Sequence, residues 1–282
     1  MRKKSHQSKA TAPKSLRVTE VDRIESISDL ERLVSDWEEA FFDMQRGHST
    51  VWYRGQGVAL PPQPGILRPP FLTSCDQAEI ITNSKAHTLW AREVTANQQF
   101  RRMGASLLPA PGSDVLTYFL AQHHGMPTRL LDWTLNSLAA LFFAVAATPD
   151  ADGVLYHFNA QYLGDLQDMR SPVVADTVKA VFGDSKIRHA AKIIPIIPDL
   201  FAGRMLQQNS VFTLHTPPVE LSENEIGFEF TPQTIPGVKK CIVPKEAKSK
   251  LRLALRRLGL TEATLFPDLD HVAKELRAAW NI

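Results

Sequence analysis

The chain has 282 residues, of which 44% are hydrophobic and 22% charged, so it can bury a sizeable core as one large domain or two small ones. The longest apolar run, 138–147, is about half of a membrane span, and no charged-then-apolar leader precedes it, which favours a soluble cytoplasmic protein. The distant cysteines Cys75 and Cys241 argue against a disulfide framework and a zinc knuckle, and the net charge of +2 is small but unevenly distributed.

Residues 1–20 form a basic segment that we predict to be a disordered tail. Six lysines and arginines and no acid fall within the first seventeen positions, among serine, threonine, glutamine and proline. Such a composition does not bury enough apolar area to fold. The tail is interpreted either as a segment that binds nucleic acid through its charge or as a solubilising terminus. The folded domain is expected at 21–282.

The first half of the domain begins with an amphipathic pattern. Apolar residues at helical spacing predict a helix over 28–43, and the β-formers 51–53 predict a strand that ends where Gly55 and Gly57 allow a turn. Five prolines within 61–70 predict an extended connection. A further helix is expected over 86–103, with arginines towards solvent.

Two further helices are predicted next along the chain, and a turn follows the first of them. Residues 114–124 predict a helix that Gly125 closes, and residues 137–147 predict a helix that is apolar on all sides and therefore belongs in the interior. Strands are expected at 154–158, 193–197 and 211–214, and closing helices at 245–258 and 268–280. Strands scattered among helices without a βαβ rhythm predict an α+β class, a single domain with a small mixed β-sheet surrounded by helices.

Arg54, at the end of the first predicted strand, is the first candidate site residue. A guanidinium in this position is costly to bury unless it meets a carboxylate, a phosphate or a carbonyl. Two interpretations stay open: an anion clamp for a phosphate-bearing ligand, or a buried salt bridge to Asp132.

A second candidate region is the polar segment 122–133 between two apolar helices. His123 or His124 can act as a general acid or base, although adjacent residues diverge at a helix end, so at most one is expected to face the site. Thr128 and Asp132 either bind a ligand or satisfy the backbone of a turn. A third metal ligand at suitable spacing is lacking, so no metal is predicted.

A third candidate region precedes the strand at 211–214. The amide of Gln208 either hydrogen-bonds a ribose hydroxyl or a base edge, or supports the loop as a structural group. Arg204 lies one helical turn before it. The segments that contain these residues have no nucleophile elbow and no zinc-protease motif.

Four motifs resemble those of the FRG domain family. They are the runs 52–56, 122–134, 204–213 and 265–270, so the resemblance extends from about Ser28 to Ala279. The resemblance implies the family's association with bacterial mobile and anti-phage loci, and a toxin or anti-phage defence effector is the expected role. An arginine at the end of an early strand and an amide at a late strand are also similar to the ADP-ribosyltransferase superfamily, which implies NAD as a substrate.

The resemblance assigns site residues on this basis. The catalytic candidates are Arg54, His123, Arg129 and Gln208. The ligand-binding candidates are Tyr53, Gln56, His124, Thr128, Asp132, Trp133 and Arg204. Arg54 or Arg129 is expected to bind the pyrophosphate, and Trp133, Tyr53 or His124 to stack on nicotinamide.

Two other functions compete with NAD chemistry, and the sequence leaves the enzymatic activity open. A nucleic-acid-binding or nucleotide-sensing domain would use the basic tail and a basic helix to follow a phosphate backbone. The residues of that helix are Lys248, Lys250, Arg252, Arg256 and Arg257. A non-catalytic interaction module would use the polar cluster as a structural network. If the protein is a toxin, we expect an antitoxin or another partner protein that silences it.

Overall fold

The computed structural model describes residues 22–43, 48–60, 86–108, 114–163, 192–198, 203–216 and 237–280. The helices are α1 (Ile27–Phe41), α3 (Ala86–Met103), α4 (Asp114–His123), α5 (Ser137–Ala146), η2 (Ala160–Leu163), α7 (Gly203–Gln207), α8 (Lys245–Arg257), α9 (Glu262–Leu265) and α10 (Leu269–Trp280). The strands are β1 (Phe42–Asp43), β2 (His48–Ser49), β3 (Val51–Gln56), β4 (Leu130–Thr134), β5 (Gly153–Asn159), β6 (Lys192–Ile196), β7 (Ser210–Thr216) and β8 (Lys239–Val243). The predictions for the tail 1–20 and the connection 61–70 lie outside the described residues.

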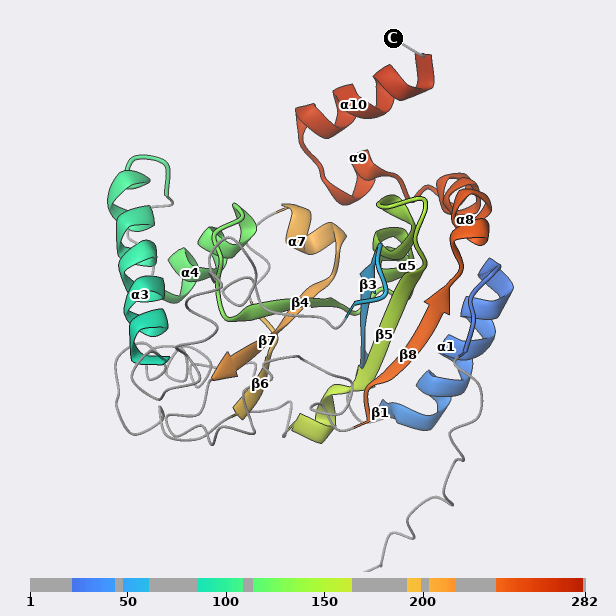
Figure 1. Ribbon diagram of the computed structural model, residues 1–282, viewed down its shortest axis with the longest axis horizontal. Coiled ribbons are helices and arrows are strands. Elements are labelled where there is room, and N and C mark those ends of the chain that lie inside the picture. Colours follow the sequence, from blue (N-terminus) through green and yellow to red (C-terminus); the bar gives the residue numbers. More distant parts are fainter. Residues whose placement is uncertain are drawn as a thin grey trace, which may run out of the picture.

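A six-stranded sheet with helices around it makes the fold α+β, as the sequence predicts (Figure 1). The strand order is β6-β7-β4-β3-β5-β8, and every paired neighbour within it is antiparallel. The mixed character expected of the sheet is limited, in the described part, to an isolated parallel bridge between Arg23 and Ile242. The strands β1 and β2 form a separate two-stranded sheet.

Helix α5 is the interior helix of the fold, and it packs on the centre of the sheet against β3, β5 and β4. Its sequence is apolar on all sides, and the side chain of Asn136 caps its first turn by accepting from the backbone N–H groups of Leu138 and Ala139. Gly55 on β3 makes the close approach possible. A Cβ atom at this position would lie 1.7 Å from the main-chain oxygen of Ala140.

The two central strands β3 and β4 separate soon after they meet. Within these described strands the register joins Tyr53 to Thr134, whereas β3 pairs with β5 along its whole length. The rest of β4, from Leu130 to Trp133, is therefore not paired with β3. The gap between the two strands is the place where the side chain of Arg54 lies.

The last turn of α5 receives its hydrogen bonds from α8. Lys248 Nζ donates to the carbonyl oxygens of Gly57 at 2.7 Å, Ala147 at 3.1 Å and Thr148 at 2.8 Å. Arg252 Nη2 donates to Val145 and Ala146. The carbonyls of Val145, Ala146 and Ala147 lie at the C-terminal end of α5, where helical N–H partners are lacking, so the cations stabilise the helix end. The competing hypothesis placed both residues on a nucleic-acid backbone; in the structure Lys248 is buried and makes these contacts within the fold, whereas Arg252 is exposed.

Replacing Lys248 by methionine is expected to lower the free energy of unfolding by about 2–3 kcal/mol, because three carbonyl groups lose a charged donor at a buried position. Urea denaturation followed by circular dichroism measures this. The matched control is Lys250→Met on the exposed side of the same helix, for which a change within about 0.5 kcal/mol is expected. Equal effects of the two substitutions would contradict the capping role.

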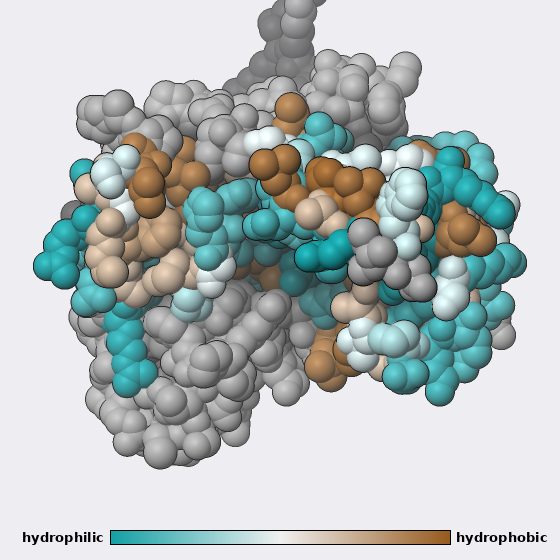
Figure 2. All heavy atoms as spheres, turned by 90° about the horizontal axis from the view of Figure 1, so that it is seen from above, coloured by the Kyte–Doolittle hydropathy of each residue, from teal (hydrophilic) through white to brown (hydrophobic). Residues whose placement is uncertain are grey.

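The C-terminal helix α10 extends away from the sheet, and none of its residues is buried. Figure 2, which views the molecule from this side, shows hydrophobic groups scattered among hydrophilic ones over the described surface. The exposed apolar residues of α10 are Leu269, Val272, Leu276 and Trp280. None of the helices in the described ranges is long and apolar enough to cross a membrane.

Most predicted elements are confirmed within a few residues at their ends, but seven elements were missed. The polar segment 122–133, for which no strand was predicted, ends in the central strand β4. The edge strand β8, the short helices α7, α9 and η2, and the strands β1 and β2 were also not predicted, and β1 takes the last two positions of the helix expected over 28–43. The predicted turn at Gly125 is confirmed, since its φ is +84°.

Candidate functional site

A cavity of about 210 Å³ lies at the gap between β3 and β4. Residues of four segments surround it: the end of β3, the stretch from α4 to β4, helix α5, and α7 with the start of β7. The lining residues are Tyr53, Arg54, Gly55, Phe119, Gln122, His123, Asp132, Trp133, Thr134, Phe143, Arg204, Met205, Gln208, Ser210 and Phe212. The three candidate regions of the sequence therefore meet in one place.

Arg54 bridges the gap between the two strands. Its Nη1 donates to the main-chain oxygen of Asp132 at 2.5 Å, and its Nε donates to Gln56 Oε1 at 3.0 Å. Gln56 in turn donates to the carbonyl of Leu60 at 2.7 Å, which fixes its amide. Gln56 does not line the cavity, so its place in the site is to orient the guanidinium of Arg54.

Asp132 supplies the carboxylate among the lining residues. The alternation along β4 places it on the same face as Leu130, next to α4, where Gln122 Nε2 donates to both carboxylate oxygens at 3.2 Å. Thr128 donates to Gln122 Oε1 and so fixes that amide. The interpretation of Asp132 as half of a buried salt bridge is wrong, because its side chain is 58% exposed and its Oδ2 lies 3.9 Å from Arg54 Nη1.

Only one of the two adjacent histidines lines the cavity, as the sequence analysis expects. His123 faces it, whereas His124 is exposed and lies against Phe100, with 6.4 Å between the ring centroids. Burial lowers the pKa of His123, and the neighbouring charges of Arg204 and His124 lower it further, against the opposing effect of Asp132. His123 is therefore predominantly neutral at pH 7 and able to accept a proton.

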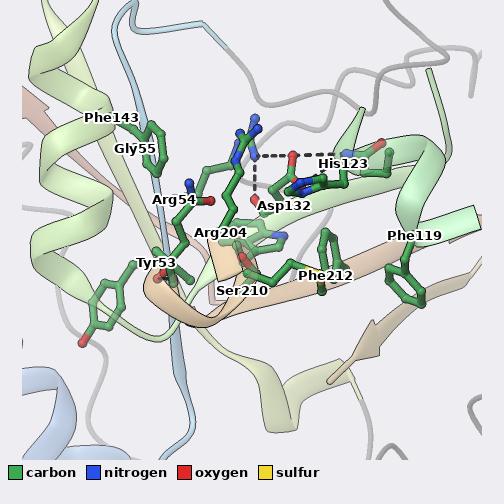
Figure 3. Close-up of a pocket in the computed structure, with 15 residues that line it drawn as sticks. Tyr53, Arg54, Gly55, Phe119, His123, Asp132, Phe143, Arg204, Ser210 and Phe212 are labelled. Atoms are coloured by element: carbon green, nitrogen blue, oxygen red, sulfur yellow. Dashed lines mark hydrogen bonds and ion pairs between the residues drawn. The ribbon is translucent and has the colours of Figure 1, made fainter. Parts of the chain in front are cut away.

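Arg204 is the second guanidinium at the cavity. Helix α7 carries it, and the side chains of Arg54 and Arg204 both reach towards Asp132 (Figure 3). Partial burial lowers the pKa of Arg204, while the carboxylates of Asp132 and Asp268 act in the opposite direction. Two guanidinium groups thus face one carboxylate at the opening, which favours an anion between them.

Three predicted ligand contacts have other partners. Gln208 Nε2 donates to the carbonyl of Leu265 at 3.0 Å, which corresponds to the structural interpretation of this amide. The ring of Tyr53 points away from the cavity (Figure 3), and its hydroxyl donates to Glu38 at 3.1 Å. The indole of Trp133 donates to Thr213 Oγ1 at 2.9 Å and packs on Phe158, so it belongs to the core.

Arg129 lies outside the cavity, although the sequence analysis predicts a catalytic role for it. Its Nε donates to Glu93 Oε2 at 2.6 Å, and both side chains are buried. Glu93 also accepts from Tyr118, whose pKa is raised chiefly by burial. This buried triad joins α3, α4 and β4, and it supports the strand that carries Asp132. Glu93 was missed because its helix was predicted to be amphipathic, a pattern in which an acid is normally exposed.

Several lining residues carried no signal in the sequence. Phe119, Phe143 and Phe212 give the cavity apolar walls, and each is indistinguishable from a core residue until the fold is known. No cluster of three histidine, cysteine or acidic side chains that could hold a metal ion occurs in the part of the chain that the structure describes. The site therefore offers guanidinium, amide, imidazole and carboxylate groups.

Comparison with known proteins identifies one domain family. Residues 49–153, which contain β3, α4, β4 and α5, match the family model of the FRG domain. The later motifs 204–213 and 265–270 lie outside the matched segment, although Arg204 completes the cavity. No curated protein and no solved structure matches the chain. The chain contains an FRG domain, and its Arg54 and Asp132 belong to it.

Proposed function

We propose that the cavity binds a nucleotide through its phosphate groups, and that the chain is an enzyme that cleaves NAD or transfers its ADP-ribosyl group. The observation that carries the proposal is the convergence of Arg54 and Arg204 on the single carboxylate of Asp132. A pyrophosphate beside this carboxylate can accept hydrogen bonds from the two guanidinium groups, since planar guanidinium groups suit phosphate oxygens.

The size of the cavity defines which part of NAD it would enclose. Pockets for drug-sized ligands commonly measure about 300–1,000 Å³, and this cavity measures about 210 Å³. It would enclose one end of the dinucleotide, the nicotinamide and its ribose, with the pyrophosphate at the opening. The aromatic walls of Phe119, Phe143 and Phe212 suit a flat ring.

Asp132 would take the role of the acid that ADP-ribosyltransferases use. Gln208 is a poor substitute for that acid because its amide is bonded to the carbonyl of Leu265. Once a phosphate engages Arg54, the exposed carboxylate of Asp132 would accept a hydrogen bond from a ribose hydroxyl. Gln122 would keep it in place through its two 3.2 Å contacts.

The reaction would use His123 as a general base. Neutral His123 would take a proton from the attacking water molecule or hydroxyl group, while the oxygen of that group bonds to C1′ of the nicotinamide ribose. The C1′–N bond would break with its electron pair passing to the pyridinium ring, so that neutral nicotinamide leaves. The resemblance to the FRG family supports a role for this activity as a toxin or anti-phage effector that a partner protein silences.

The test is incubation of the purified chain with NAD, alone and with cell lysate, while nicotinamide release is followed by chromatography. Isothermal titration with NAD and with ADP-ribose measures binding separately. Release that Asp132→Asn abolishes without weakening binding would support the proposal. Binding without release would indicate a nucleotide sensor, and neither binding nor release would contradict nucleotide recognition altogether.

The pH dependence of binding and release is expected to have opposite signs. Because the pKa of His123 lies below its ordinary value of 6.5, the imidazole becomes positively charged only when the pH falls below 6.5. The added charge strengthens binding of the anionic ligand, whereas loss of the base slows release. Titrations and rates between pH 8 and 5.5 measure this, with Arg204, His124 and Asp132 as the neighbouring charged groups. His123→Asn should flatten the binding curve, whereas His124→Asn should keep the curve and move its midpoint to a higher pH, because a neighbouring positive charge that lowers the pKa of His123 is removed.

A further inference from the structure

The C-terminal segment 265–271 lies close to the short helix α7 and its flank at three places. Gln208 donates to the carbonyl of Leu265, which is itself buried in the main core. A Cβ atom on Gly203 would lie 3.4 Å from Pro267 Cγ. Between these contacts, Arg204 Cζ lies 4.4 Å from the centroid of the Phe266 ring. Helix α7 has five residues and limited stability of its own, so this segment fixes its position.

The ring of Phe266 is itself held on its other sides. His271 stacks on it, with 4.6 Å between the centroids and 15° between the planes, and Phe143 meets it edge-on at 6.0 Å. Asp268 fixes His271 through contacts of 2.7 and 2.8 Å to Nδ1 and through the backbone N–H of His271 at 2.9 Å. The three planar groups of Arg204, Phe266 and His271 therefore follow one another in a stack.

We propose that Phe266 is the positioning residue that holds the guanidinium of Arg204 at the cavity. A cation over an aromatic face is attracted by the ring quadrupole, and a planar guanidinium also stacks on it. Phe266 does not line the cavity, so it acts through Arg204. The inference extends the proposed function, in which Arg204 binds the phosphates of the nucleotide.

The position of Arg204 can be measured without a ligand. In nitrogen-15 NMR of the arginine side chains, the Nε–H signal of Arg204 should show a ring-current shift and an ordered heteronuclear relaxation value. Both should be lost in Phe266→Leu and retained in Phe266→Tyr. Phe266 is half-buried, so the leucine variant is expected to fold, which circular dichroism checks. Unchanged Arg204 signals in folded Phe266→Leu would overturn the proposal.

A double-mutant cycle then tests the effect on binding. Phe266→Leu should weaken NAD binding about 5-fold, as expected for a cation–π contact of this size, and it should have no further effect in the background of Arg204→Gln. Arg277→Gln, an exposed change on α10, is the matched control and should bind as the parent does. An equal loss in both backgrounds would contradict action through Arg204. If the parent chain bound no nucleotide, the proposed function would fail, and the NMR result alone would decide the position of Arg204.

Discussion

Arg54→Gln is expected to weaken nucleotide binding about 100-fold while the protein stays folded. The loss corresponds to about 2–3 kcal/mol, the usual contribution of hydrogen bonds to a charged group. Glutamine retains polarity but not the charge, and it does not present two parallel donors to a phosphate. Titration with NAD measures the affinity, and nicotinamide release should fall at least in proportion.

The stability of this variant decides between a site residue and a structural one. A buried salt bridge would leave an uncompensated buried charge when one partner is removed, at a cost of several kcal/mol. Asp132 is instead 58% exposed, and an exposed ion pair contributes only about 0–1 kcal/mol. The remaining cost comes from the lost bonds to the main-chain oxygen of Asp132 and to Gln56 Oε1. Thermal unfolding should therefore shift by a few degrees at most.

The matched control for this experiment is Arg256→Gln, which removes the same charge from an exposed position on α8. It should bind NAD as the parent chain does. If Arg256→Gln weakened binding as much as Arg54→Gln, the effect would be a general one of net charge. If Arg54→Gln unfolded the protein, the guanidinium would be a structural element of the sheet.

The sequence predicted the long, strongly patterned elements well. Helix α5 is apolar on all sides and β5 is rich in β-formers, so their local pattern and their burial agree. Strand β4 was missed because Asp132 interrupts the run of Leu130, Leu131 and Trp133. The polar residue is there because one face of the strand opens to the cavity. Strand β8 begins with lysines that suit an edge strand but hide its pattern.

The candidate site was predicted as a set of segments rather than as a geometry. The motif residues do meet, because β3, β4 and α7 with the start of β7 converge at the gap in the sheet. Their directions were not predictable, since a change of one position in a strand reverses the face. Tyr53 and Arg129 therefore point to partners in the interior, whereas Arg54 reaches Asp132 through the gap. Gln122 and Phe266 lie within the predicted motifs, but their roles became visible only through their contacts.

Gly55→Ala is expected to cause the largest loss of stability, at least about 3 kcal/mol, the upper range for overpacking a core. The added Cβ atom would lie 1.7 Å from the carbonyl oxygen of Ala140 and 2.8 Å from the amide nitrogen of Ala144. Both atoms belong to the backbone of α5, so rotation of a side chain does not relieve the overlap. The helix would have to move away from β3, or the strand would have to bend.

Urea denaturation of this variant measures the loss, with Gly203→Ala as the matched control. Gly203 begins α7, and a Cβ atom there would meet Pro267 Cγ at 3.4 Å, an ordinary van der Waals distance. Its replacement should leave stability unchanged or slightly raised, because alanine favours the helix. Gly55 also lines the cavity beside Arg54, so a displacement of α5 would move Phe143 and open the wall of the site. A Gly55→Ala protein as stable as its parent would mean that the helix packs farther from the strand, and the cavity would then be larger than about 210 Å³.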